Sequence, residues 1–306
     1  MRFGRRSRPS TTVLVHAGRE PAFDGDDELL DGAIELGSLT KALSGIVLAG
    51  LDRRGELPLT TAVTDVLDLD TTLRCGDQVV TIEHLATHHS GLPRLGEHGR
   101  VDPDDPYRDI DESEVVDEIR RLAASGPGEA TYEYSNLGFA VVGLCIARVA
   151  GSWPQAMRDH LLDPLGVEEV WPGPPPDGAE RVTARNRRGR PVSWWSMGGY
   201  AAAGACTGTA RGVGALLRGL IDADPRSEVG GDLRTAIRPR RTIDGGSIGL
   251  GWHLASTGQA WHNGATGGFS AFAAFSTGLD RAVARLAVGP PNDQAEREAG
   301  GRIVDP

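Results

Sequence analysis

The 306-residue sequence predicts an α/β protein in which an antiparallel sheet is flanked by helices and a mostly helical lobe is inserted between two parts of the sheet domain. Three observations support this fold class. A strand pattern near the amino end precedes an apolar helix pattern, a long and mostly helical block follows, and alternating or apolar strand patterns occupy the carboxyl end. We therefore assign residues 1–58 and 193–306 to the sheet domain and residues 59–192 to the lobe.

The amino-terminal elements lead to a short polar motif. Residues 11–16, Thr-Thr-Val-Leu-Val-His, are rich in β-branched residues and predict a strand, and a second short extended piece leads into Ser38. From Ser38 the apolar positions recur at helical spacing, which predicts a helix over residues 38–54 that Gly55 ends. Ser38 therefore begins a helix just after a strand.

The middle of the chain has mostly helical signals between about residues 60 and 170. The expected elements are a helix capped by Thr81, an amphipathic helix over residues 113–124 and an apolar helix over residues 135–150 that Gly151 ends. Segment 172–192 is rich in Pro, Gly and Arg and has no periodicity, so we interpret it as the connection between the lobe and the sheet domain.

The carboxyl-terminal part begins with a predicted helix over residues 209–223. Strand patterns separated by turn residues follow, and we expect them to be adjacent antiparallel strands. They cover residues 246–254, 258–263, 268–276 and 281–289. The first and last parts of the chain should then build one sheet.

The composition argues against several classes of protein. The formal net charge of −10 argues against a nucleic-acid partner, which requires a basic face. No stretch approaches the roughly 20 consecutive apolar residues of a membrane-spanning helix. The three cysteines, Cys75, Cys145 and Cys206, are odd in number and widely spaced, which favours a reduced compartment over a disulfide framework.

The amino end does not have the pattern of a secretory signal. Residues 1–8 are basic, but the apolar run that follows covers only residues 13–15, whereas a signal peptide needs about 7 to 15 apolar residues. We therefore expect a cytoplasmic protein, or an exported one if the natural start of the chain lies upstream.

Lys41 is the single lysine among the 32 Lys and Arg residues, and it follows Ser38 by three positions. On a helix the two side chains share one face, so the amine can reach the hydroxyl. An arginine cannot be deprotonated in a protein, whereas burial and the positive end of the helix dipole both favour a neutral lysine, which can take the proton of Ser38. For this tetrapeptide alone, a simple helix cap at Ser38 is an equally good interpretation.

Two later motifs favour the catalytic interpretation. Tyr134-Ser135-Asn136 stands where a loop enters the apolar helix, and His262-Asn263-Gly264 stands at the end of a strand before a Gly-rich turn. Ser-x-x-Lys, Tyr-x-Asn and a basic residue-x-Gly, in this order, resemble the motifs of the serine β-lactamase and penicillin-binding superfamily, in its class C β-lactamase and D-alanyl-D-alanine carboxypeptidase branch. The β-lactamase/transpeptidase-like fold is thus implied from about residue 30 to residue 290. The other segments that look like this family are Glu35–Lys41, Thr81–His88, Ser90–Pro93, Gly249–Trp252 and Gly267–Phe269.

The resemblance implies roles for the first two motifs. Ser38 would be the nucleophile that forms an acyl-enzyme, Lys41 would help to remove its proton, and Tyr134 would be the second proton-transfer group. A phenol acts in this way only where a nearby cation favours its anion. Asn136 would orient Lys41 and an amide of the substrate. The family needs neither a metal nor an organic cofactor.

The third motif is implied to bind the substrate. His262 occupies a position that is lysine in class C β-lactamases and histidine in some carboxypeptidases and esterases of the branch. Asn263, Gly264 and Ala265 would contact the substrate, and the N–H groups of Ser38 and Ala265 would hold the oxyanion. Because a neutral imidazole offers a carboxylate no full charge, recognition of an acidic substrate would need an arginine or a protonated His262.

The chain departs from the family pattern in two further places. Gly208 and Gly212 stand where the family usually has serine and aspartate, so we expect a weaker helix cap there. The terminal segments are short, so we expect either a less covered sheet or a partner subunit over it, as in a homo-oligomer.

Alternatives remain for several residues and for the function. His84 and His88 have a helical spacing that can bind zinc, although the usual metalloprotease glutamate is missing. Trp194 and Trp195 fit either a substrate groove or packing between the lobes. We predict a serine hydrolase with a small-molecule or peptide substrate, which is a D-Ala peptide, a β-lactam or an ester. The alternative is a penicillin-binding or sensor protein of the same fold with little or no turnover.

Overall fold

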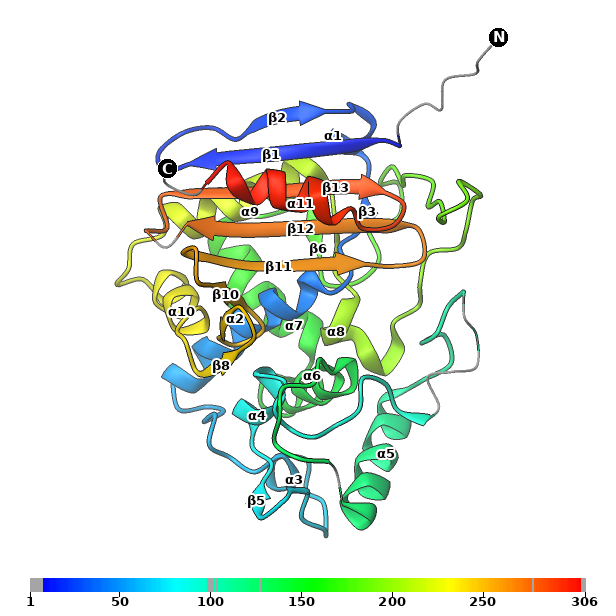
Figure 1. The fold of residues 1–306 in the computed structure, drawn as a ribbon, viewed down its shortest axis with the longest axis vertical. Coiled ribbons are helices and arrows are strands. Elements are labelled where there is room, and N and C mark those ends of the chain that lie inside the picture. Colours follow the sequence, from blue (N-terminus) through cyan, green and yellow to red (C-terminus); the bar gives the residue numbers. More distant parts are fainter. Residues whose placement is uncertain (1–7, 98–101, 103, 127, 277, 304–306) are drawn as a thin grey trace.

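The computed structural model describes residues 8–97, 102, 104–126, 128–276 and 278–303. Its largest element is an eight-stranded antiparallel sheet with the strand order β2-β1-β13-β12-β11-β10-β9-β8 (Figure 1). The strands are β1 (Ser10–His16), β2 (Ala22–Gly25), β8 (Arg241–Ile243), β9 (Gly246–Ile248), β10 (His253–Ala255), β11 (Gln259–Ala265), β12 (Phe269–Ser276) and β13 (Arg281–Val288).

The two ends of the chain meet in this sheet. β1 pairs with β13 along its whole length, from Ser10 opposite Ala287 to His16 opposite Arg281. The predicted strand at residues 11–16 is therefore confirmed, and so is the prediction that the first and last parts of the chain build one antiparallel sheet.

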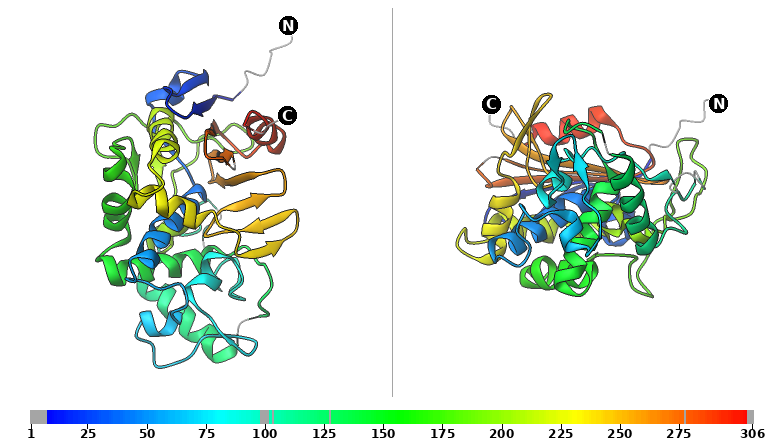
Figure 2. Two further views of the ribbon diagram at one scale, coloured as in Figure 1. Left: turned by 90° about the vertical axis from the view of Figure 1, so that its left-hand side faces the viewer. Right: turned by 90° about the horizontal axis from the view of Figure 1, so that it is seen from below.

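Helices lie on both faces of the sheet, as the predicted fold class requires. In Figure 2, left, α11 stands on one side of the sheet, and α2, α9 and α10 stand on the other. The helices are α1 (Glu28–Asp31), α2 (Leu39–Arg53), α3 (Val63–Val66), α4 (Ile82–Ala86), α5 (Glu112–Ser125), α6 (Asn136–Ala150), α7 (Trp153–Met157), α8 (Ala201–Gly204), α9 (Ala210–Asp222), α10 (Glu228–Ala236) and α11 (Asp293–Gly301).

α2 is the central helix of the molecule. All its residues from Leu39 to Leu51 are buried, as expected for a helix that is apolar on every side. It packs against α10, α8 and β11, and it lies between the sheet and the helices drawn below it in Figure 1. The predicted helix over residues 38–54 is confirmed, with Ser38 as N-cap and Gly55 just beyond the C-cap.

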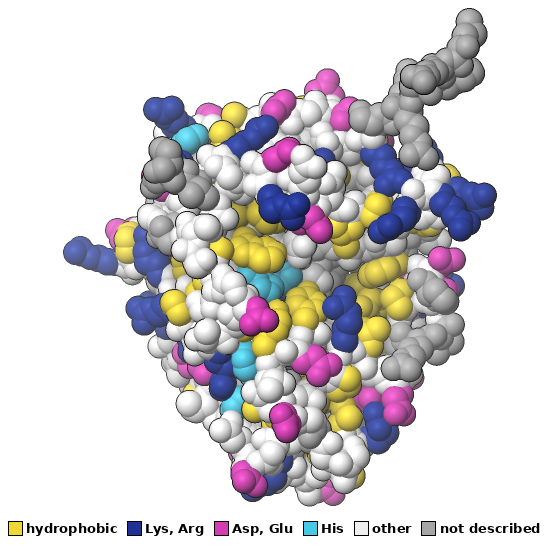
Figure 3. Space-filling model, viewed as in Figure 1, with side chains coloured by type: hydrophobic (Ala, Val, Ile, Leu, Met, Phe, Trp, Pro, Cys, Tyr) yellow, Lys and Arg dark blue, Asp and Glu magenta, His cyan; other side chains and the backbone are white. Residues whose placement is uncertain are grey.

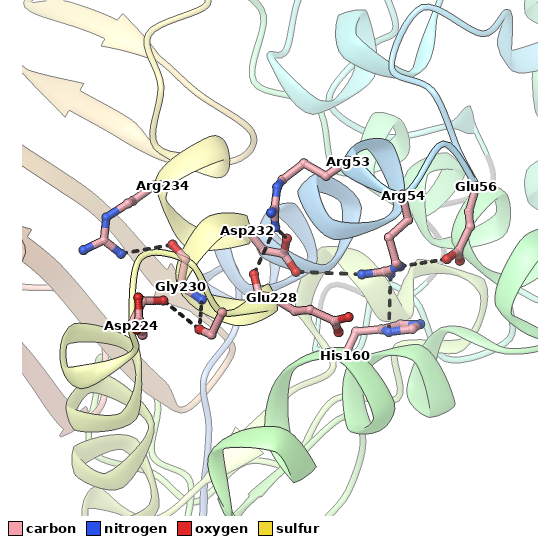
Figure 4. A network of polar contacts seen from close by, with 10 residues as sticks. Arg53, Arg54, Glu56, His160, Asp224, Glu228, Gly230, Asp232 and Arg234 are labelled. Atoms are coloured by element: carbon pink, nitrogen blue, oxygen red, sulfur yellow. Dashed lines mark hydrogen bonds and ion pairs between the residues drawn. The ribbon is translucent and has the colours of Figure 1, made fainter.

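The carboxyl end of α2 is fixed by a network of charged side chains (Figure 4). Arg53 forms an ion pair with Asp232 of α10, whose side chain is almost fully buried. Arg54 bonds to Glu56 at 2.7 Å and to Nδ1 of His160 at 3.4 Å. Because these contacts join α2 to α10 and to the π-helical turn after α7, they hold the helix that carries Ser38 and Lys41 in place.

The predicted helical lobe contains α3, α4, α5 and α6 and the hairpin of β4 (Arg74–Cys75) and β5 (Gln78–Val79), all in the lower part of Figure 1. The helices expected over 113–124, 135–150 and 209–223 are found as α5, α6 and α9. The domain limits stay a prediction. Part of the predicted lobe pairs with strands of the predicted sheet domain. β6 (Val170–Trp171), which lies within 59–192, pairs with β7 (Thr207–Gly208), and β7 also pairs with β3 (Ile34–Glu35).

The strand expected over residues 246–254 is in fact two strands, β9 and β10, and β8 and α10 were not predicted at all. The break between β9 and β10 is a turn pressed onto α2. A Cβ added to Gly251, whose φ is 73°, would meet the carbonyl oxygen of Lys41 at 2.7 Å, and one added to Gly45 would meet that of Leu250 at 1.9 Å. Close approach to α2, which the local pattern does not encode, interrupts the strand.

Two expectations about helices are corrected. Thr209 caps α9 by accepting the N–H of Gly212 at 2.9 Å, so the cap does not need a side chain at Gly208 or Gly212. A Cβ added to Gly212 would meet the carbonyl oxygen of Glu169 at 2.2 Å, so glycine is needed there for packing. The sheet face expected to lack cover carries α11, where Ala299 packs with Phe272 and other residues of β12 and β13. A homo-oligomer stays a prediction.

Among the described residues, no single helix is long and apolar enough to cross a membrane. α6 and the segment Trp153–Leu165 reach the necessary length and apolar composition only together, and the chain bends by 82° between them.

Cys75, Cys145 and Cys206 are all buried and unpaired, so none belongs to a disulfide framework.

Candidate active site

Ser38 and Lys41 lie together at the amino end of α2. The Nζ atom of Lys41 is 2.9 Å from the Oγ atom of Ser38. Gly37, just before them, has a φ of 51°, and a Cβ added to it would meet the backbone nitrogen of Ala265 at 2.7 Å. The tight strand-to-helix turn therefore presents the Ser38 hydroxyl to a cavity while the amine lies in the protein interior.

The electrostatics of Lys41 favour a neutral amine. Its side chain has no exposed surface, and burial, followed by the positive charge of Arg94, lowers its pKa well below the usual value. The amine donates a hydrogen bond to the carbonyl oxygen of Ala203 at 2.6 Å. Its lone pair remains available, and the Ser38 hydroxyl is within reach to donate to it. The pair is thus arranged for proton transfer from Oγ to Nζ.

Tyr134 faces both groups. Its side chain is hydrogen-bonded to that of Ser38, and its ring centroid is 5.1 Å from Nζ of Lys41. Burial raises the pKa of the phenol above its usual value, although the bond to Ser38 and the charge of Arg94 act in the opposite direction. Contrary to the expectation of an anion favoured by a cation, the phenol keeps its proton in the resting site and can act as a proton donor.

His88 positions the loop that carries Tyr134. Its Nδ1 accepts the N–H of Ser135 at 3.1 Å, and its carbonyl oxygen accepts the N–H of Glu133 at 2.8 Å. Its ring centroid is 4.5 Å from that of Tyr134. Burial lowers the pKa of His88 well below its usual value, and the neutral ring can therefore accept at Nδ1.

His84 and His88, whose spacing could bind zinc, make other contacts in the structure. His84 closes a capping box with Thr81 at the start of α4, whereas His88 lies against Tyr134. Among the described residues, no group of three or more His, Cys, Asp or Glu side chains could hold a metal ion.

Asn136 begins α6 and lines the cavity beside Ser38. Its Nδ2 donates to the hydroxyl of Tyr107 at 2.8 Å, and its buried Oδ1 has no hydrogen-bond partner among the residues described. The described hydrogen-bond partners of the Lys41 amine are Ser38 and Ala203, and Asn136 is not among them. The implied role of Asn136 in orienting Lys41 and a substrate amide stays a prediction.

His262 and Asn263 point to opposite faces of β11, because side chains alternate along a strand. His262 is buried, and its ring centroid is 6.1 Å from that of Tyr134. Burial, then His253 and Lys41, lower the pKa of His262 well below its usual value, so it supplies no positive charge. Nδ2 of Asn263 donates to Glu296 of α11 at 3.2 Å. The side chain of Asn263 therefore points away from the cavity beside Ser38, and a contact of this residue with substrate would involve its backbone.

Gly264 and Ala265 bring β11 against the start of α2. A Cβ added to Gly264 would meet the carbonyl oxygen of Leu36 at 2.0 Å and the backbone nitrogen of Ser38 at 2.9 Å. The N–H of Thr266 donates to Phe269 across the β11–β12 pair, and alternate residues of an antiparallel pair point their N–H groups away from the partner. The N–H of Ala265 is therefore directed toward the cavity that contains Ser38.

Sequence analysis missed the arginine that lines this cavity, Arg94. Its guanidinium carbon lies 5.2 Å from the ring centroid of Tyr134, and no ion pair or side-chain hydrogen bond joins it to another described residue. The only signal in the sequence was its place directly after Ser90-Gly91-Leu92-Pro93, a segment like the family's. Because His262 is neutral, Arg94 is the residue that can face a carboxylate of a substrate.

Glu35 begins the family-like segment Glu35–Lys41, and the sequence predicted no role for it. It is buried, and it accepts the hydroxyl of Thr266 at 2.7 Å and the N–H of Trp195 at 2.5 Å. Burial raises the pKa of the Glu35 carboxyl to about 7, and Asp105 adds to the effect, whereas both hydrogen bonds oppose it. The carboxyl joins two walls of the cavity. Trp195 lines the cavity, whereas Trp194 packs on Phe269 of the predicted sheet domain. The indole N–H of Trp194 donates to the carbonyl oxygen of Val182, in the predicted lobe, at 3.3 Å.

The cavity beside Ser38 has a volume of about 70 Å³. Hydrophobic and histidine side chains gather in a hollow of the surface below the sheet (Figure 3). Its lining includes Ser38, Arg94, Tyr107, Asn136, Trp195 and Ala265.

Known structures have the same fold. The class C β-lactamase of Rhodobacter sphaeroides superposes with a TM-score of 0.79 at 21% identity, over 96% of this chain and 93% of that one. A β-lactamase of Sulfitobacter sp. EE-36 gives a TM-score of 0.79 at 20% identity, over 95% and 90%.

Curated proteins match shorter stretches. Esterase EstB of Burkholderia gladioli is 34% identical over 158 residues, which are 45% of this chain and 38% of the esterase. Penicillin-binding protein 4 of Amycolatopsis lactamdurans is 29% identical over 45% of this chain and 36% of its own length. The D-alanyl-D-alanine-carboxypeptidase/endopeptidase AmpH of Escherichia coli (strain K12) is 25% identical over 54% and 43%. The matches thus span less than half of each relative.

A sequence model of the Beta-lactamase family matches residues 10–305, nearly the whole chain. The structural likeness to class C β-lactamases agrees with this match, and so does the chain order of the three motifs. The chain therefore belongs to the Beta-lactamase family, within the β-lactamase and penicillin-binding superfamily of serine hydrolases.

Proposed function

We propose that the protein hydrolyses an amide or ester through an acyl-enzyme at Ser38. One observation carries the proposal: the hydroxyl of Ser38 lies 2.9 Å from a fully buried amine whose pKa is lowered. A serine hydroxyl is a weak nucleophile unless an adjacent base takes its proton, and a neutral Lys41 is such a base.

Acylation then proceeds as follows. Oγ of Ser38 bonds to the carbonyl carbon of the substrate as its proton passes to Nζ of Lys41. The carbonyl oxygen becomes an oxyanion that accepts from the N–H groups of Ser38 and Ala265, each worth about 3–4 kcal/mol in a preformed hole. When the bond to the leaving group breaks, Tyr134 gives that group its proton and takes one from Lys41, so both side chains return to neutral.

Deacylation repeats the sequence with water. The water oxygen bonds to the acyl carbon as its proton passes to Lys41, and the acid product leaves when the bond to Oγ of Ser38 breaks. Ser38 recovers its proton from Lys41. The neutral amine and protonated phenol of the resting site are the starting forms that this cycle needs.

For the substrate we favour small esters and amides over β-lactams. The neutral His262 provides no charge for the carboxylate of a β-lactam, which leaves Arg94 as the cation of the cavity lining. A cephalosporin or a D-Ala-D-Ala peptide is therefore the second choice, and it would depend on Arg94 for anion recognition.

The test is intact-mass spectrometry of the purified protein after incubation with a fluorophosphonate, and separately with a p-nitrophenyl ester or a penicillin. We expect one fluorophosphonate adduct on the wild type, none on Ser38→Ala, and hydrolysis of the p-nitrophenyl ester with release of p-nitrophenol. An ester- or penicillin-derived adduct that never disappears would favour a penicillin-binding or sensor protein. Absence of any adduct would contradict both functions.

A further inference from the structure

The cavity beside Ser38 is small for the substrates of a typical hydrolase. Ligand pockets usually measure about 300–1,000 Å³, whereas this cavity has about 70 Å³. The space therefore suits a short acyl group, such as an acetyl or propionyl group.

Tyr107 lines the cavity next to Asn136. Its hydroxyl accepts the Nδ2 hydrogen bond of Asn136 at 2.8 Å, so this amide is already engaged. Its ring is only 5% exposed, and it packs on the rings of Tyr200 and Trp195 at centroid distances of 4.9 and 5.7 Å. Tyr107 thus fills space beside the cavity that a longer acyl chain would need.

The segment around Tyr107 is firmly attached to the opposite wall. The N–H of Ser196 donates to both carboxyl oxygens of Asp105, at 3.0 and 3.2 Å. The indole N–H of Trp195 donates to the carbonyl oxygen of Asp104 at 2.7 Å, and the N–H of Gly199 donates to that of Ile110 at 2.7 Å. These four bonds hold the chain in place on both sides of Tyr107.

We propose that Tyr107 determines the acyl specificity of the enzyme by limiting the acyl group to about two or three carbon atoms. This inference rests on the proposed function, because it assumes that an acyl group is bound at Ser38. The limit comes from the volume of the ring and from its fixed position, and the bond to Asn136 helps to hold the ring there.

The test compares kcat/KM for p-nitrophenyl acetate, butyrate and hexanoate, which share one leaving group. We expect the wild type to prefer acetate over hexanoate by at least tenfold. Tyr107→Ala should raise the hexanoate-to-acetate ratio at least tenfold, whereas Tyr107→Phe, which keeps the ring, should change it less than threefold. Tyr132→Ala is the matched control, because Tyr132 is 37% exposed and does not line the cavity.

A second measurement covers the case in which Tyr107→Ala turns over slowly. The rates at which fluorophosphonates with ethyl and octyl chains label Ser38 are followed by intact mass, and the octyl-to-ethyl ratio should rise in Tyr107→Ala. The inference is wrong if the wild type hydrolyses hexanoate as efficiently as acetate, or if the ratios of Tyr107→Ala equal those of Tyr132→Ala. Neither result would contradict the proposed hydrolase function. If the wild type neither hydrolyses an ester nor is labelled, the proposed function itself fails.

Discussion

Replacing Lys41 tests whether this position supplies a base or a positive charge. Lys41→Met keeps an unbranched chain of similar length in the buried site but has no amine. Lys41→Arg keeps a cation but cannot release a proton. If the neutral amine is the base, both substitutions should lower kcat/KM by a similar factor.

The expected loss is about 10²- to 10⁴-fold, the usual contribution of a positioned general base, which corresponds to about 3–5 kcal/mol of transition-state stabilisation. The structure adds a second effect for arginine. The side chain at this position has no exposed surface, and the charged group that acts on it is another cation, Arg94. A permanent charge there would lack a counter-ion and would destabilise the fold by several kcal/mol, so Lys41→Arg should unfold at a lower temperature than Lys41→Met.

The assay is steady-state hydrolysis of p-nitrophenyl acetate, with the thermal midpoint measured for each variant to confirm that it is folded at the assay temperature. Ser38→Ala gives the background rate. If Lys41→Arg stays within about fivefold of the wild type while Lys41→Met loses a hundredfold or more, then the position supplies charge. The reasoning from burial and a lowered pKa would then be refuted.

Two further predictions concern the walls of the site. Gly264→Ala should lower kcat/KM at least a hundredfold, because its Cβ would meet Leu36 at 2.0 Å and push the N–H of Ala265 out of the oxyanion hole; wild-type turnover of the ester by this variant would argue against that hole. Folding raises the pKa of the Glu35 carboxyl from 4.5 to about 7. Between pH 4.5 and about pH 7 this carboxyl therefore binds more protons in the folded protein than in the unfolded protein. Its contribution to stability is therefore lost as pH rises from about 4.5 to about 7, by on the order of 3 kcal/mol. Urea midpoints from pH 4.5 to 8 should show this decline in the wild type and a flatter profile in Glu35→Gln; parallel profiles would assign the decline to other groups.

The sequence was informative where local chemistry and chain order coincide. β-branched residues predicted β1, and apolar positions at helical spacing predicted α2. The three motifs identified the family and placed Ser38, Lys41, Tyr134 and His262 in one site. The break between β9 and β10 was beyond such reasoning, because it is caused by contact with a distant helix.

Tertiary structure corrected the details of the site. Asn263 was predicted to bind substrate because it lies inside a motif, but strand alternation turns its side chain toward α11. Asn136 is bonded to Tyr107, which no motif marks. Arg94 was overlooked because a single arginine among many carries no local signal.

The sequence by itself determined which groups we propose for the chemistry, since a lysine three positions after a serine at a helix start must share its face. Only the tertiary structure decided the protonation states of these groups and the space around them. Both depend on how completely residues far apart in the chain exclude water from Lys41, Tyr134 and His262, and burial of that kind is a property of the assembled layers rather than of any segment.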